Sequence, residues 1–121
     1  MPRYFTKSKF KLAIECPTKL FYSSRKSIYK DNKQEDSFLR MLADGGFQVG
    51  QLAKVIFKDG HEIKSKDAEK AEAETLKLLS ENEEIVLLEP AIRYKNFFVR
   101  IDVLIKRKNT FELIEVKAKS Y

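Results

Sequence analysis

The chain has 121 residues, of which 43% are hydrophobic and 12% aromatic; this predicts one domain over residues 1–121 and excludes disorder along its whole length. A net charge of +6 favours a polyanionic partner such as nucleic acid, although an anionic membrane surface or simple solubility would also produce it. One cysteine and one histidine exclude a disulfide framework and a multi-cysteine or histidine zinc site. No apolar run is long enough for a membrane span and no secretory signal is present, so we expect a cytoplasmic protein with no membrane partner.

The first half of the chain reads as helix. Lysines alternate with apolar residues over Thr6–Ser24, where Pro17 suits the first turn of a second helix. After a polar segment at Ser27–Gln34, a helix is expected from about Glu35, interrupted or ended by Asp44-Gly45-Gly46. The apolar positions that follow have helical spacing: Val49, Leu52, Ala53 and Ile56.

A further helix is expected after the turn Lys58–His61. Asp67 can cap it, and it would run to about Ser80 with Ala71 and Thr75 facing inward.

The last third reads as strand. Three segments are rich in apolar and β-branched residues, namely Ile85–Leu88, Phe97–Ile105 and Phe111–Lys117. The last two are joined by a polar connection of hairpin length, Lys106–Thr110. Helices followed by strands define the α+β class, with a three-stranded antiparallel meander after the N-terminal helices.

Charged residues of the predicted hairpin lie two apart, which places them on one face. Asp102, Glu115 and Lys117 would meet there, and Glu89 would add a third carboxylate from the preceding strand. Clustered carboxylates beside an apolar sheet favour a hard cation such as Mg²⁺, with the Val116 carbonyl as a further ligand. Lys117 would hold or deprotonate a water that attacks a phosphodiester.

Alternating lysine and glutamate on a strand more often form a solvated face with cross-strand ion pairs. Asp102 is different, because an acid inside the apolar segment Phe97–Ile105 breaks the local pattern, and such breaks tend to be functional.

Several sequence segments, taken in order, resemble a known superfamily. Arg100-Ile101-Asp102-Val103-Leu104 and Leu113-Ile114-Glu115-Val116-Lys117 resemble motifs II and III of the PD-(D/E)XK nucleases, within the RecB-like branch that includes the CRISPR adaptation nucleases. The segment Cys16-Pro17-Thr18-Lys19-Leu20-Phe21-Tyr22 is similar to the opening motif of that branch. Gly46–Ala53 and Glu74-Thr75-Leu76 look like an uncharacterised bacterial family within it, whose members are much longer.

This resemblance implies a restriction-endonuclease-like core and Mg²⁺- or Mn²⁺-dependent hydrolysis of DNA. It assigns Glu89, Asp102 and Glu115 as metal ligands and Lys117 as the catalytic lysine. Where relatives often carry a histidine ligand, this chain offers only Gln48 and Gln51. Relatives continue into another helix and strand, so we expect either a fragment of a longer protein or a second chain, such as a homodimer partner, that completes the sheet.

Basic residues that would contact nucleic acid occur near the N-terminus and on the predicted hairpin. They are Lys7, Lys9, Lys19, Arg25, Arg100, Lys106, Arg107 and Lys108. Two alternatives to a nuclease remain open: a catalytically inactive nucleic-acid-binding module on the same fold, and a protein-interaction domain that pairs through its exposed last strand.

Overall fold

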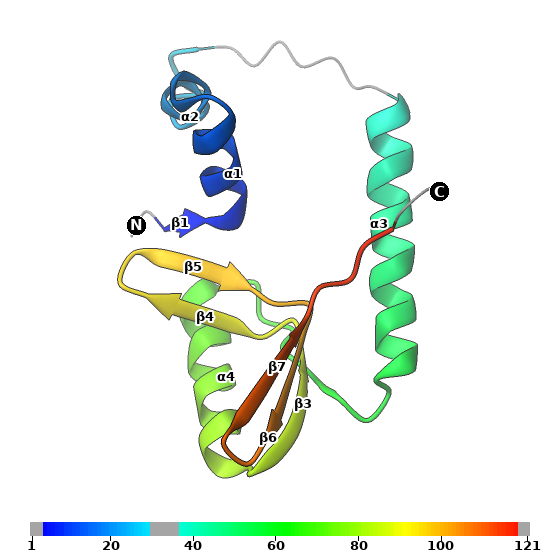
Figure 1. Cartoon of the computed structure of the whole chain (residues 1–121). Coiled ribbons are helices and arrows are strands. Elements are labelled where there is room, and N and C mark those ends of the chain that lie inside the picture. Colours follow the sequence, from blue (N-terminus) through cyan, green and yellow to red (C-terminus); the bar gives the residue numbers. More distant parts are fainter. Residues whose placement is uncertain (1–3, 30–36, 119–121) are drawn as a thin grey trace.

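The computed structural model describes residues 4–29 and 37–118. These ranges hold the helices α1 (Lys7–Glu15), α2 (Pro17–Ser23), α3 (Ser37–Ile56) and α4 (Ala68–Glu81). Their strands are β1 (Phe5–Thr6), β2 (His61–Glu62), β3 (Glu84–Leu88), β4 (Ala91–Tyr94), β5 (Phe97–Arg100), β6 (Val103–Arg107) and β7 (Thr110–Ile114). Together they form an α+β structure with two small mixed sheets (Figure 1), which confirms the predicted class.

Local capping signals fix the beginnings of three helices. The Asp67 side chain accepts a hydrogen bond from the Lys70 N–H at 2.9 Å, so α4 begins where it was predicted. Thr6 caps α1 in the same way, through the Lys9 N–H. Pro17 occupies the first turn of α2, as predicted, because that position needs no hydrogen bond from its nitrogen.

Helix α3 differs from the prediction, because it continues without a break through Asp44-Gly45-Gly46. Glycine costs only about 1 kcal/mol relative to alanine inside a helix. The apolar positions Leu42 and Val49 lie seven residues apart on either side of the glycines, so one helical face continues across them. The predicted start near Glu35 and most of the polar segment Ser27–Gln34 fall outside the described residues.

The strands β3 to β6 make up one long two-stranded ribbon that is bent in the middle. On one side of the bend β3 pairs with β6, with Leu88 opposite Val103, and on the other β4 pairs with β5, with Ala91 opposite Arg100. Two backbone hydrogen bonds cross the bend at 3.0 Å, from the Glu89 N–H to the Asp102 carbonyl and from the Ile101 N–H to the Pro90 carbonyl.

The bend carries the ribbon from one sheet into the other. One sheet has the order β1-β5-β4 and the other β2-β3-β6-β7 (Figure 1). The predicted strand Phe97–Ile105 is therefore two strands, which corrects the simple three-stranded meander. Alternation of apolar residues marks an extended chain, but it does not reveal a change of partner. Pro90, which lacks an N–H, is a natural place for the pairing to break.

Other strand boundaries also differ from the prediction. The last strand ends at Ile114 rather than Lys117, and β6 extends to Arg107, so the connection to β7 is a short turn in which Lys108 has a φ of 54°. The strands β1, β2 and β4 were not predicted; two of them have only two residues each and leave little signal in a sequence.

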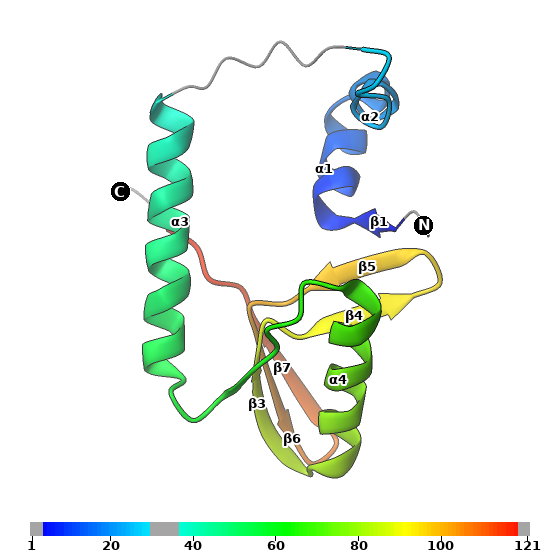
Figure 2. The same ribbon diagram turned by 180° about the vertical axis from the view of Figure 1, so that it is seen from behind.

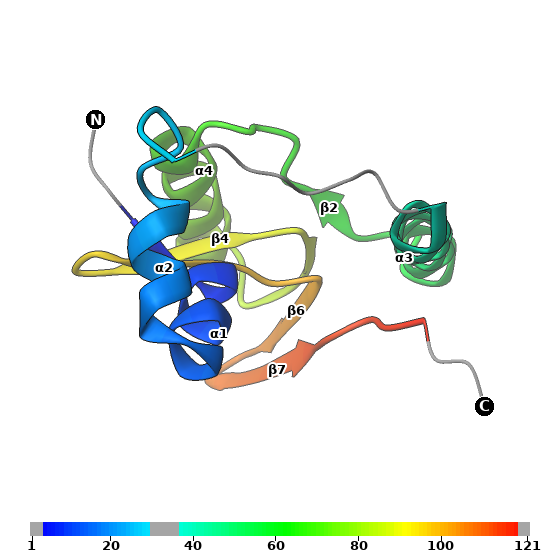
Figure 3. The same ribbon diagram turned by 90° about the horizontal axis from the view of Figure 1, so that it is seen from above.

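The core lies between α4 and the bent ribbon, where α4 packs on β3 and β4 (Figure 2). The cluster on this side joins Ile63, Ala71 and Ala91. A second cluster joins Leu88, Val103 and Ile105 on the opposite face of the ribbon, where Phe57 and Val116 pack against it. Helix α3 lies on the other side of the molecule from α1 and α2 (Figure 3). Among the described residues, no helix combines the length and apolar character that crossing a bilayer requires.

Candidate functional site

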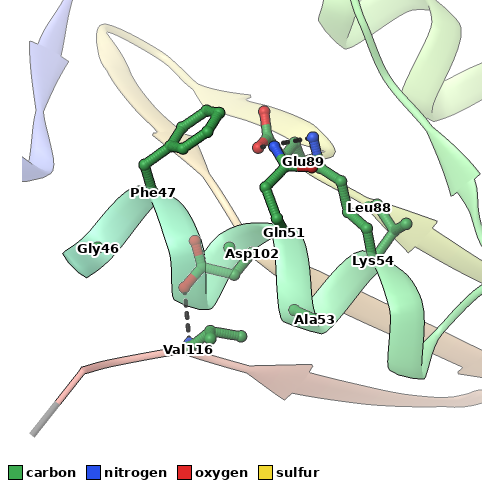
Figure 4. A pocket seen from close by; sticks show the side chains of 10 residues that line it. Gly46, Phe47, Gln51, Ala53, Lys54, Leu88, Glu89, Asp102 and Val116 are labelled. Carbon is green, nitrogen blue, oxygen red and sulfur yellow. Dashed lines mark hydrogen bonds and ion pairs between the residues drawn. The ribbon is translucent and has the colours of Figure 1, made fainter. Parts of the chain in front are cut away.

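A pocket of about 220 Å³ lies between α3 and the bend of the ribbon (Figure 4). Its wall includes residues of α3, the end of β3, the bend and the segment that follows β7. These lining residues are Gly46, Phe47, Gly50, Gln51, Ala53, Lys54, Leu88, Glu89, Asp102 and Val116. The pocket thus brings together two of the predicted carboxylates, Glu89 and Asp102, and the predicted backbone ligand Val116.

The bend itself positions the two carboxylates. The hydrogen bond from the Glu89 N–H to the Asp102 carbonyl joins their backbones directly. Glu89 adopts a φ of 55°, and its own carbonyl accepts a hydrogen bond from Arg100 Nη2 at 3.0 Å. A positive φ is uncommon for a residue with a side chain and persists only where the surroundings hold it. Fixed backbones at both residues limit how far the two carboxylates can move apart.

The Asp102 side chain connects the bend to the end of β7. Its Oδ2 atom accepts a hydrogen bond from the Val116 N–H at 2.7 Å (Figure 4). The Val116 side chain packs against the apolar cluster of Leu88, Val103 and Ile105. This contact leaves Oδ1 of Asp102 as the oxygen that receives no hydrogen bond from any residue in the described ranges.

Lys54 on α3 is a pocket residue that the sequence analysis missed. Its Nζ lies 2.5 Å from Glu62 Oε1 and 3.9 Å from Glu89 Oε1. The hydrogen bond to Glu62 is the main cause that raises the pKa of Lys54 and lowers the pKa of Glu62. The signal in the sequence was its spacing, because Lys54 comes three residues after Gln51 and so shares its helical face.

Gln48 and Gln51 stand in the region where the related nucleases often carry a histidine ligand. Only Gln51 is among the residues that line the pocket.

Glu115 and Lys117 lie outside the pocket lining and form an ion-pair cluster with Lys7. Lys7 Nζ contacts Glu115 Oε1, and Lys117 Nζ lies 3.5 Å from Glu115 Oε2. The hydrogen bond from Lys7 is the main cause that lowers the pKa of Glu115. Glu115 and Lys117 do not join Asp102 in the pocket, because β7 ends at Ile114 and Glu115 pairs with Lys7 instead.

The locations of the three predicted carboxylates determine which of them could bind one metal ion together. Within residues 4–29 and 37–118, no three acidic, histidine or cysteine side chains lie close enough to hold one ion together. Glu115 is therefore not assembled with Glu89 and Asp102. The two carboxylates that do share the pocket suit Mg²⁺, which commonly binds one or two protein carboxylates and keeps several waters.

Two of the residues predicted to contact nucleic acid have structural partners instead. The Arg100 guanidinium donates hydrogen bonds to the carbonyls of Ser65 at 2.6 Å and Ile63 at 2.9 Å, besides that of Glu89. Lys106 Nζ donates to the carbonyls of Leu79 at 2.6 Å and Asn82 at 2.8 Å, at the end of α4. A cation there satisfies carbonyl groups that have no partner inside the helix.

The other predicted nucleic-acid contacts lie in two places. Arg107 and Lys108 are exposed at the turn between β6 and β7. The rest belong to α1, α2 and the turn after α2. Three of them have partners near in the chain: Lys9 Nζ donates to the Tyr4 carbonyl at 2.8 Å, Lys19 lies 3.7 Å from Glu15, and Arg25 lies over the Phe21 ring at 3.9 Å. Together with Lys7, these four residues make the helical end of the molecule basic.

Comparisons of this chain with family models, with curated proteins and with solved structures find no match. The chemistry of the pocket is therefore the basis for a function. Two carboxylates fixed through their backbones beside one lysine can bind a hard cation, and the basic residues on the helices attract anions.

Proposed function

We propose that the protein is a Mg²⁺- or Mn²⁺-dependent nuclease of the PD-(D/E)XK type that hydrolyses phosphodiester bonds in DNA. The observation that carries the proposal is the pairing of Glu89 and Asp102 in one pocket at the bend of the ribbon. The resemblance of the sequence motifs to that superfamily selects the reaction. The two small mixed sheets do not form a clear restriction-endonuclease-like core, so the proposal rests on the pocket and on the sequence motifs.

In this proposal the pocket residues have separate tasks. The Glu89 carboxylate and the Oδ1 atom of Asp102 would hold the cation, with the Val116 carbonyl as a neutral ligand. When bound, the cation would lower the pKa of a water and stabilise negative charge on the phosphate. Lys54 would balance the charge of Glu89 when the site is empty, since it already lies near that carboxylate.

Glu115 and Lys117 would act from beside the pocket. Lys117 is exposed and bonded only to Glu115 among the described residues, so its ammonium is available to hold the attacking water or a phosphate oxygen. Glu115 would orient Lys117 through their ion pair and would act as a ligand only after release from Lys7.

Cleavage of a supercoiled plasmid and of a single-stranded oligonucleotide, each with Mg²⁺, Mn²⁺ or chelator, tests the proposal. Asp102→Asn should reduce the cleavage rate by about 100-fold or more, because a neutral amide is a poor ligand for a hard cation. Asparagine can still accept the Val116 N–H, so the fold is expected to persist. Glu112→Gln changes an exposed acid of β7 outside the pocket and should leave the rate unchanged.

The metal itself gives a second readout. Titration calorimetry with Mg²⁺ should show binding to the unaltered chain and to Glu112→Gln but not to Asp102→Asn. Equal cleavage by the unaltered chain and Asp102→Asn would identify a contaminating nuclease and reject the proposal. Metal-independent DNA binding without cleavage would favour the inactive nucleic-acid-binding module instead.

A second candidate function rests on the edge of the larger sheet. Strand β7 is the last in the order β2-β3-β6-β7, and its residues Phe111 and Leu113 are exposed. An open edge with apolar side chains can pair with a strand of another chain, which would make this an interaction domain or a homodimer. Light scattering after gel filtration would detect the dimer, and Leu113→Lys should dissociate it.

A further inference from the structure

A second groove lies between α1 and the β4–β5 hairpin, with a volume of about 350 Å³. Five aromatic rings line it, contributed by β1, α1, β4 and β5: Phe5, Phe10, Tyr94, Phe97 and Phe98. Figure 1 shows α1 and β1 beside β5 at the end of the molecule away from the bend. The groove is therefore separate from the pocket that contains Glu89 and Asp102.

The rings at the mouth of the groove are open to solvent. Phe10 is 53% exposed, Tyr94 70% and Phe97 51%. Phe5 lies between two of them, nearly perpendicular to Phe10 at 85° and to Phe97 at 88°. In an edge-to-face contact one ring uses only its edge, so ring faces remain for another flat group.

The charged residue among those that line the groove is basic. Lys7 lines it, and Lys11 lies one helical turn further along α1. Lys95 is at the turn of the hairpin, with its Nζ 5.4 Å from the Tyr94 ring centre. No acidic residue of the described chain is among those that line the groove. Exposed aromatic rings rimmed by lysines match a polyanion with flat, apolar bases.

We propose that this groove binds single-stranded DNA, with bases stacked on Phe10, Tyr94 and Phe97 and with the backbone near the lysines. The choice of DNA rests on the proposed nuclease function. Aromatic side chains that stack bases beside a basic track are the usual means of binding a single strand without sequence preference. Duplex DNA does not fit this chemistry, because its bases already stack on one another and present only their edges.

The groove and the pocket are connected through one ion pair. Lys7, at the start of α1, contacts Glu115, and the next residue, Val116, lines the pocket. A strand held in the groove would thus leave it beside Lys7 and Glu115. Phosphates that reach Lys7 would compete with Glu115 for its ammonium.

Fluorescence anisotropy with a labelled oligo-dT and the whole chain, in chelator, measures binding without cleavage. The double variant Phe10→Leu/Tyr94→Leu keeps apolar side chains but removes two stacking faces, and should weaken oligo-dT binding by about tenfold or more. Phe38→Leu removes a ring of similar exposure, 56%, on α3 outside the groove lining, and should bind as the unaltered chain does. Lys11→Ala should weaken binding less and reduce its salt dependence.

Three results would overturn the inference: no binding of oligo-dT, equal binding by the double variant with an unchanged circular dichroism spectrum, or tighter binding of a duplex of the same length. If the double variant instead dissociates a dimer seen by light scattering while oligo-dT binding is unchanged, the groove holds a second copy of this chain and the inference also fails. Because these measurements use chelator, they are independent of cleavage. If the Asp102→Asn experiment rejects the nuclease proposal, the result of the oligo-dT binding experiment remains valid.

Discussion

Two regions of the molecule differ in how completely their apolar side chains are covered. One is the ribbon β3–β6 with α4, and the other comprises the helices α1, α2 and α3. Leu87, Val103 and Leu104 of the ribbon are almost fully buried. Helices α1 and α2 have no buried residue and α3 has only Ala53, although α1 and α3 show helical spacing of apolar residues. Val55 of α3, for example, is 69% exposed.

This contrast teaches that amphipathic spacing predicts a helix but does not predict its partner. Burial of apolar surface is the main source of stability. Within the described chain, stability therefore resides mainly in α4 and the ribbon. The exposed apolar faces of α1 and α3 are suited to further contacts.

The largest expected effect comes from Arg100, which ties the ribbon to the segment before α4. Arg100→Lys should lower the free energy of unfolding by about 2–4 kcal/mol, because one ammonium cannot span the three carbonyls that the planar guanidinium reaches. Urea denaturation measures the change. Arg107→Lys, at the exposed turn, is the matched control and should stay within about 0.5 kcal/mol. Equal effects would show that the ribbon does not depend on Arg100.

Thr75 tests the packing of α4 on β4. Its fully buried hydroxyl donates to the Ala71 carbonyl at 2.7 Å and accepts from the Ala91 N–H at 3.0 Å. Thr75→Val keeps the shape but leaves that N–H unsatisfied, at a cost of about 1–3 kcal/mol. Thermal or urea unfolding would show it, and Thr75→Ser should recover much of the loss by restoring the hydroxyl.

The pair Lys54–Glu62 joins α3 to the larger sheet and should be sensitive to pH. The pKa of Glu62 is lowered by Lys54, so its contribution to stability is present above the ordinary glutamate pKa and is lost as pH falls through the lowered value. The pKa of Lys54 is raised, so its contribution is lost only as pH rises above the ordinary lysine pKa.

Glu62→Gln should therefore lower stability by at most about 1 kcal/mol at neutral pH. The difference from the unaltered chain should disappear in acid, as thermal unfolding at several pH values would reveal. A difference that persists with Glu62 protonated would mean that the glutamate acts through packing rather than charge.

The smallest effect is expected on the exposed face of α3. Val55→Ser should change stability by no more than about 0.5 kcal/mol, since little surface is uncovered. A loss as large as that of Thr75→Val would mean that α3 packs in solution against another chain. Repeating the denaturation at higher protein concentration would distinguish the two cases.

Features of the fold that are determined by interactions between residues close in sequence could be predicted. Asp67 and Pro17 act on backbone groups within a few residues, so the starts of α4 and α2 could be predicted. Gly45 and Gly46 misled the prediction for α3, because their intrinsic preference is weaker than the apolar face that continues across them.

The bend of the ribbon depends on contacts distant in sequence. Phe97–Ile105 has the spacing of one strand, and nothing local shows that its two halves belong to different sheets. The sequence correctly grouped Glu89 with Asp102, but it grouped Glu115 with them by assuming a continuous strand through Lys117. Lys54 was missed because its neighbours in the pocket come from other segments; the roles of all these residues stay predictions.

The β4–β5 hairpin connects the aromatic groove to the pocket. Tyr94 and Phe97 lie at the tip of the β4–β5 hairpin, while Glu89 and Asp102 lie at its base, joined by backbone hydrogen bonds. The hairpin is thus one stretch of paired backbone that carries aromatic rings at its tip and both carboxylates at its base. Because β1 also pairs with β5 near the tip, the backbone pairing sets the spacing between the aromatic groove and the pocket.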